Sequence, residues 1–218
     1  MDGTDVCAVL REKRINELHH ANTVATSLTF LTLGGLASRG EVERQGLRQT
    51  EQYTDPLDKR YGIWNDVFTD TVDIHGRARR LNQYGPVLFI LPVDVLEDLP
   101  DGTEVMITKK NPTKWVPKEA PGERYFADVD ELEEGLTRGT FDQMVTLRLE
   151  DGILSFPEET RMLVDDPQRS PNDAFKRAMK QLAPAAAAAG VALATRTCGD
   201  DCACVNQYAQ FRGLDGIF

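Results

Sequence analysis

The chain has 218 residues, of which 41% are hydrophobic and 28% are charged, enough apolar material for one compact domain with a sizeable core. Its formal net charge of −10 argues against a broad nucleic-acid-binding platform, because such proteins neutralise phosphates with a basic excess. Basic clusters at 11–14 and 75–80 still allow transient binding of one flexible nucleic-acid strand at a small basic patch. The amino-terminal residues lack a signal-peptide pattern, and the strongest apolar run, GPVLFILPV, is too short to cross a bilayer. We therefore expect a single cytoplasmic domain over 1–218 with no membrane partner.

The first part of the chain predicts helices around one short strand. Residues 5–15 have helical apolar spacing, and INELHH (15–20) reads as extended. Asn22 or Thr23 can cap a helix that runs to Leu33, and Gly34-Gly35 can end it, because glycine readily adopts the left-handed conformation of a helix terminus. Residues 41–60 are polar and turn-rich, and a further helix is expected over 73–82.

Strands dominate the later part of the chain. They are predicted at 86–91, 104–109, 141–149, 152–156, 161–166 and 191–196, with an acidic helix or turn at 128–136. A last helix is expected to start near Ser170-Pro171 and to end at Gly190, kinked or restarted at Pro184. The pattern predicts a mixed α and β fold.

Three stretches of sequence carry candidate chemistry, and we call them the three cassettes. The first, residues 16–40, places LHHAN before an amphipathic helix and GGLASRG. The second, residues 61–89, is YGIWNDVFTDTVDIHGRARRLNQYGPVLF, and the third, residues 139–149, is GTFDQMVTLRL. Each has a structural explanation as well: a buried or solvated histidine pair, a basic solvated helix before a core strand, and an ordinary strand.

The order and spacing of these cassettes resemble the ADP-ribosyltransferase fold, closest to the DarT-like toxins that modify DNA or RNA. The resemblance implies an α+β fold of split antiparallel sheets flanked by helices, and an NAD-dependent mono-ADP-ribosyltransferase. In the first cassette, His20 matches the family's NAD-contacting histidine, His19 takes the preceding aromatic position, and Asn22 takes the usual threonine position. In the second, Arg77 is the nearest match to an arginine that holds NAD and activates the reaction, with Arg79 and Arg80 as rivals.

The third cassette departs from the family. The glutamate expected at the start of the strand, which would stabilise the cationic ribose as nicotinamide leaves, aligns with Gln143. Glutamine keeps a hydrogen bond but has no charge and cannot act as a base. Three interpretations are open: Gln143 belongs to an inactive relative, Asp142 or Glu150 supplies the carboxylate, or the chain is a Glu-to-Gln form of a toxic enzyme. We favour the last.

The resemblance thus implies a candidate site and several partners. Gln143, Arg77 and His20 are the expected catalytic residues, and Tyr61, Trp64 and Tyr84 are candidate stacking surfaces for nicotinamide or a target base. The expected acceptor is a base in single-stranded DNA or RNA, with a protein acceptor open and an antitoxin or chaperone as a further partner. The expected setting is a toxin or an antiphage effector. The alternatives are an inactive module that binds NAD, ADP-ribose or a partner protein, and a tRNA 2′-phosphotransferase-like enzyme. The expected NAD-binding residues are His20, Ala21, Asn22, Gly35, Leu36, Tyr61, Trp64 and Arg77.

Four cysteines complete the inventory. Three lie in CGDDCAC, at Cys198, Cys202 and Cys204, and Cys7 is remote in sequence. A structural zinc site commonly needs four ligands in paired groups, and Cys7 completes a set only if the two ends of the chain meet. The sequence therefore favours reduced tail thiols and predicts no metal site.

Overall fold

A computed structural model describes residues 1–74, 85–167, 173–198 and 204. The chain forms a seven-stranded sheet in the order β5-β6-β3-β1-β4-β8-β9, and β2 pairs with β7 in a small second sheet. Every pairing is antiparallel except that of β8 with β9, which is parallel. The strands are β1 (Glu17–Asn22), β2 (Gly35–Ala37), β3 (Val67–Asp70), β4 (Val87–Pro92), β5 (Glu104–Ile107), β6 (Met144–Arg148), β7 (Ile153–Ser155), β8 (Arg161–Asp166) and β9 (Ala192–Thr197).

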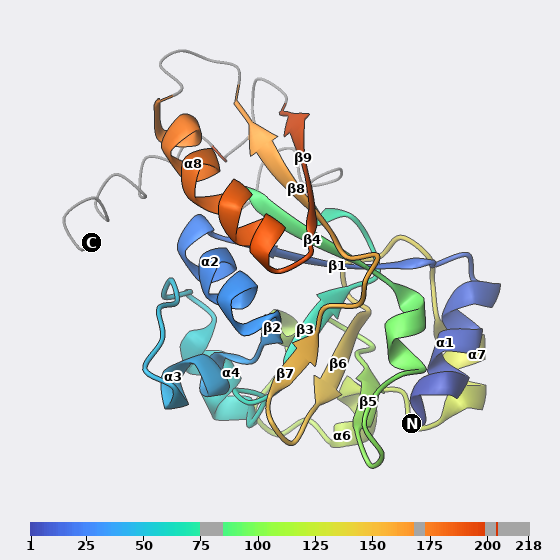
Figure 1. Cartoon of the computed structure of the whole chain (residues 1–218). Helices are drawn as coiled ribbons and strands as arrows, with labels where there is room; N and C mark the ends of the chain where they lie inside the picture. The colour runs from blue at the N-terminus through green and yellow to red at the C-terminus, as the bar shows by residue number, and fades with distance from the viewer. Residues whose placement is uncertain (75–84, 168–172, 199–203, 205–218) are drawn as a thin grey trace.

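Helices flank this sheet, so the expected α+β class with mostly antiparallel strands is confirmed (Figure 1). Helix α2 packs against α8, and α1 packs against α7 and the 3-10 helix η1. Among the described residues, every helix is too short or too polar to cross a membrane. The helices are α1 (Gly3–Glu12), α2 (Val24–Leu33), α3 (Arg39–Arg44), α4 (Asp55–Tyr61), η1 (Val93–Leu96), η2 (Pro112–Lys114), α6 (Pro121–Arg124), α7 (Val129–Gly135) and α8 (Asp173–Ala188).

The two faces of the sheet bury different clusters because successive strand residues point to opposite sides. On one face, Leu18, Phe89 and Leu91 belong to the main core, into which α1, α2 and α8 also pack. On the other face, Ala21 and Leu88 belong to a much smaller cluster. Among the described elements, only the first of these faces is covered by a large core.

Local sequence signals account for α2 as expected. Thr23 is its N-cap, and Gly34 ends it in the left-handed conformation with φ 72°. The polar stretch 41–60 was expected to form turns, and this expectation is wrong in part because it contains most of α3 and all but the last residue of α4. Ser38 caps α3, and a proline in the first turn pre-orders α4. The helix expected over 73–82 lies almost entirely outside the described residues.

Replacing Thr23 with alanine should lower the free energy of unfolding by about 1 kcal/mol, the usual value of an N-cap. The Thr23 hydroxyl accepts a hydrogen bond from the Thr26 amide at 3.4 Å and also bonds the Thr50 hydroxyl at 2.6 Å. Urea unfolding measures the change. Thr32→Ala is the control, because that exposed hydroxyl only donates to Leu28 within the helix. Equal losses in the two variants would contradict the capping role.

Candidate functional site

A cavity of about 630 Å³ lies where the start of β1 meets the end of β3 and the segment before β6. Its volume falls within the range of small-molecule sites, roughly 300–1,000 Å³. His19 lines it from the first cassette, Thr71 and Asp73 from the second, and Gly139 from the third. The sheet therefore gathers all three cassettes at one cavity. Three more lining residues carry the chemistry discussed below: Arg14, Glu17 and Arg138.

His19 is a buried titratable group of this cavity. The residue is 7% exposed, and its Nδ1 atom has no hydrogen-bond partner within the described part of the chain. Burial lowers the pKa of His19 below the usual 6.5, against the opposing carboxylates of Asp73 and Glu17. The imidazole is therefore neutral at pH 7; its Nδ1 is enclosed by the protein, and its Nε2 lies on the side of Glu17.

His20, the residue that the resemblance selects, points to the opposite face. Neighbouring strand residues alternate, so while His19 lines the cavity, the His20 ring packs on Phe30, with ring centroids 5.5 Å apart. Its Nδ1 lies 2.7 Å from the Phe68 carbonyl oxygen, and its Nε2 lies 3.2 Å from the Asn22 amide nitrogen. This pattern assigns hydrogen to Nδ1, and burial lowers the pKa of the ring. Both nitrogens of His20 are thus engaged within the protein.

Two guanidinium groups stand at the cavity without an ion-pair partner among the described residues, those of Arg14 and Arg138. Both residues are exposed. Arg14 has φ 60°, and no other described residue except glycine has a positive φ. It follows the C-cap of α1, where glycine usually takes this conformation, and an arginine there costs about 1–2 kcal/mol. These forked cations suit the oxygens of a phosphate or pyrophosphate.

The carboxylates of the cavity differ in how firmly they are held. Asp73 accepts from Arg196 Nη1 at 2.5 Å, so its charge is already neutralised. Glu17 is more exposed; it pairs with Arg161 and has an oxygen 3.8 Å from His19 Nε2. Both carboxylates act on the buried imidazole, and the effect of Asp73 on its pKa is larger than that of Glu17.

Gln143 is absent from the cavity lining, although Arg138 and Gly139 of the preceding segment form part of the wall. It is 7% exposed; its Nε2 donates to the Gly135 carbonyl at 2.9 Å and its Oε1 accepts from the Thr137 amide at 2.7 Å. Its backbone carbonyl accepts from the Thr71 hydroxyl at 3.1 Å. The amide of Gln143 therefore fixes the turn that leads to Arg138 and Gly139.

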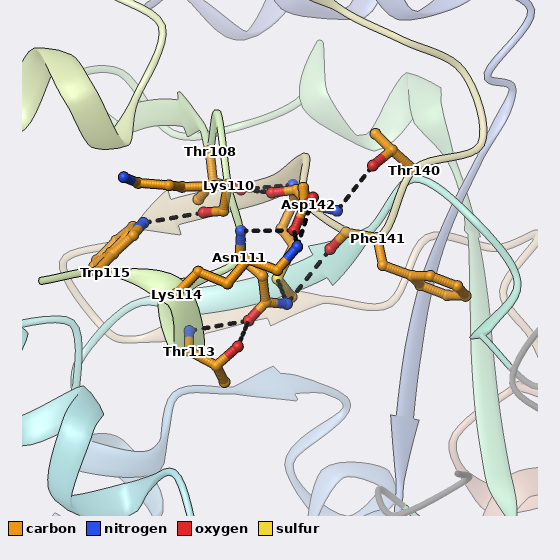
Figure 2. A network of polar contacts seen from close by, with 10 residues as sticks. Thr108, Lys110, Asn111, Thr113, Lys114, Trp115, Thr140, Phe141 and Asp142 are labelled. Carbon is orange, nitrogen blue, oxygen red and sulfur yellow. Dashed lines mark hydrogen bonds and ion pairs between the residues drawn. The ribbon is translucent and has the colours of Figure 1, made fainter. Parts of the chain in front are cut away.

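The alternative carboxylates for position 143 are engaged elsewhere or lie in a loop. Figure 2 shows Asp142 facing Lys114, whose Nζ lies 2.6 and 2.8 Å from its two oxygens. The Asn111 backbone N–H is a second donor at 3.3 Å, and the Lys114 contact is the main cause of the lowered pKa of Asp142. Glu150 is exposed beyond the end of β6. Neither lines the cavity.

The other residues expected to bind NAD in the first cassette serve the fold. Ala21 packs in the smaller core cluster, and the Asn22 carboxamide oxygen accepts from the Thr23 amide at 2.8 Å. Gly35 and Leu36 lie in β2 against β7, and a Cβ at Gly35 would stand 2.5 Å from the Leu154 carbonyl oxygen. Glycine is needed there for strand pairing.

The candidate stacking residues of the second cassette also have partners within the fold. The Tyr61 hydroxyl donates to the Trp115 carbonyl at 2.6 Å. The Trp64 indole donates to Glu43 at 2.7 Å, and the Lys59 ammonium lies 4.2 Å from its ring centroid. Neither aromatic ring lines the cavity. The predictions at Arg77, Arg79, Arg80 and Tyr84 lie outside the described residues.

Several cavity residues have no recognisable signal in the sequence. Arg14 lies in the basic REKR cluster, but nothing in the pattern connects it with Arg138, which comes 124 positions later (138 − 14). Glu17 precedes the histidine pair without any motif of its own. The sheet register brings these residues together.

Comparison with known proteins gives limited results. No protein-family model matches the chain. No curated protein matches it either. Among solved structures, the chain is similar to "Thermus sp. 2.9 DarT in complex with ADP-ribosylated ssDNA", with a TM-score of 0.47 and 10% identity over 86% of this chain and 95% of that one. A likeness this distant assigns neither an activity nor a site.

Proposed function

We propose that the chain is an NAD-dependent mono-ADP-ribosyltransferase whose substrate site is the cavity at His19. One observation carries this proposal: residues of all three cassettes, whose order resembles that family, line the same cavity. The cavity has the size of a ligand site, a buried neutral imidazole and two unpaired guanidinium groups among the described residues, which together fit a dinucleotide.

The residues present divide the work of such a reaction between them. NAD supplies an ADP-ribosyl group: its nicotinamide–ribose bond breaks and a ribose–acceptor bond forms as the acceptor loses a proton. Arg14 and Arg138 hold the pyrophosphate, and His19 hydrogen-bonds a ribose hydroxyl through Nε2, the ring nitrogen on the side of Glu17. The negative charge of Glu17 favours the cationic ribose of the transition state. In this proposal His19 takes the role that the resemblance gave to His20.

The acceptor proposed from the resemblance is a base of single-stranded DNA or RNA, and the setting is a toxin or an antiphage effector with a neutralising partner. The two guanidinium groups offer a small basic patch at the cavity for such a strand, although the net charge of −10 opposes extended contact with nucleic acid. A protein acceptor is the alternative. Mass spectrometry of the modified macromolecules distinguishes it from a nucleic-acid acceptor.

Calorimetry of the full chain with NAD tests the cavity. Arg138→Ala and His19→Ala should each weaken NAD binding about tenfold or more, because each removes a hydrogen bond to a bound anion or hydroxyl. Arg60→Ala is the matched control, since Arg60 is exposed on α4 and away from the cavity lining. Circular dichroism checks folding. Absence of NAD binding by the unmodified chain, or an equal loss in Arg60→Ala, would overturn the proposal.

One observation favours a second function, an inactive module that binds NAD, ADP-ribose or a partner protein. Gln143 is bonded at both ends by backbone groups of the preceding turn, so its amide has a structural role that a carboxylate would perform less well. NAD binding without turnover in either the unmodified chain or Gln143→Glu would identify the module.

A further inference from the structure

We propose that Asp165, Cys198 and Cys204 bind a structural Zn²⁺ ion. One oxygen of Asp165 and the two sulfur atoms all lie within 4.8 Å of one another. Asp165 is 2% exposed, Cys204 is fully buried and Cys198 is half-buried. Two thiolates and a carboxylate are ligands that zinc commonly takes in proteins.

The fold explains why these residues meet. Strands β8 and β9 pair in parallel with Asp165 opposite Arg196, so Cys198 emerges beside the end of β8, where its amide donates to the Asp166 carbonyl at 3.1 Å. Cys204 then packs in the main core next to this strand end. Asp165 lies 33 positions before Cys198 (198 − 165), so no local spacing in the sequence connects the two residues.

The distances need little adjustment to accept an ion. The two sulfur atoms stand 2.9 Å apart, closer than the ~3.8 Å between sulfurs that are each about 2.3 Å from a tetrahedral zinc. Separating them by about 1 Å opens the site. A water molecule or a further side chain completes four ligands.

The charges around the cluster also suit zinc. Two thiolates, one carboxylate and Zn²⁺ leave one net negative charge, and the Arg196 guanidinium lies beside it, with Nε 3.5 Å from Asp165 Oδ1. Such a hydrogen bond to a ligating carboxylate fixes its orientation. The ion would fasten β9, an edge strand with mostly exposed side chains, to the core.

Metal content of the full chain tests the site. After purification under reducing conditions, equilibration with excess Zn²⁺ and desalting, we expect about one zinc per chain by inductively coupled plasma mass spectrometry. Cys198→Ser, Cys204→Ser and Asp165→Asn should each lower zinc retention at least tenfold during dialysis against a competing chelator. Cys7→Ser and Asp166→Asn are the matched controls, because Cys7 is buried elsewhere against the Val93 carbonyl and Asp166 is the next residue of β8.

Substitution with Co²⁺ keeps the test independent of mutant folding. The unmodified chain should show thiolate-to-cobalt charge-transfer bands that one equivalent of Zn²⁺ abolishes. A chain that retains no zinc, a cobalt complex without thiolate bands, or controls that lose zinc as readily as the cluster variants would overturn the proposal.

Discussion

Gln143→Glu is expected to raise the rate of NAD cleavage by about 10²- to 10⁴-fold, the usual contribution of a positioned acid–base group. The segment that Gln143 fixes forms one wall of the cavity, and its backbone carbonyl bonds the lining residue Thr71. A carboxylate at 143 can still accept from the Thr137 amide but cannot donate to the Gly135 carbonyl, so one of its oxygens is released for the proposed reaction. Release of nicotinamide measures the rate.

The same substitution carries a stability cost that serves as an internal check. Losing the hydrogen bond to the Gly135 carbonyl should lower the free energy of unfolding by about 1 kcal/mol. Gln52→Glu adds the same charge at a position outside the cavity lining and should change neither quantity. Lower stability without any gain in NAD cleavage would support the binding module in place of the enzyme.

Mass spectrometry of cells that express Gln143→Glu identifies the acceptor. ADP-ribose added to DNA or RNA bases is the expected result, and growth inhibition should accompany it. Modification confined to protein would replace the nucleic-acid proposal with a protein acceptor.

Asp70→Asn is expected to stabilise the protein at pH 8 by up to about 4 kcal/mol. Asp70 lies opposite His19 across β1 and β3, and burial raises its pKa from 3.8 to about 7. The folded state therefore holds a proton that the unfolded state releases between pH 4 and pH 7, so stability from this group falls as pH rises through that window. About three pKa units at 1.36 kcal/mol each set the upper limit.

Thermal unfolding from pH 4 to pH 8.5 checks this expectation. The gap between Asp70→Asn and the unmodified chain should be near zero at pH 4, widen up to pH 7 and then stay level. The lowered pKa of His19 acts in the opposite direction, because stability from a neutral buried imidazole is lost as pH falls, but His19 titrates in both proteins and cancels in the difference. Asp101→Asn, at an exposed site, removes the same charge and should give no pH-dependent gap.

Local signals predicted much of the fold because they act over a few residues. Thr23 and Gly34 delimit α2 through their own capping geometry, and the apolar run at 86–91 forms the interior strand β4. The parallel pairing of β8 and β9 was not predicted, since it depends on the path of α8 between them.

The candidate site depends on packing and hydrogen bonds that local sequence signals do not predict. The period-two rule states that His19 and His20 face opposite ways, but only the packing of helices decides which face is thickly covered and which holds the cavity. The role predicted for Gln143 rested on its position in the third cassette. Its hydrogen bonds depend instead on how the turn at 135–137 folds back. Such long-range contacts leave no periodic trace in the sequence.

Arg196 is shared between two neighbourhoods, since one guanidinium binds Asp73 at the cavity and Asp165 at the cysteine cluster. Any event that alters the charge on Asp165 therefore changes how tightly Arg196 restrains Asp73. By thermodynamic reciprocity, a molecule that displaces Asp73 alters the cysteine cluster by the same free energy. The tail of the chain and the mouth of the cavity are in this way energetically coupled through a single side chain.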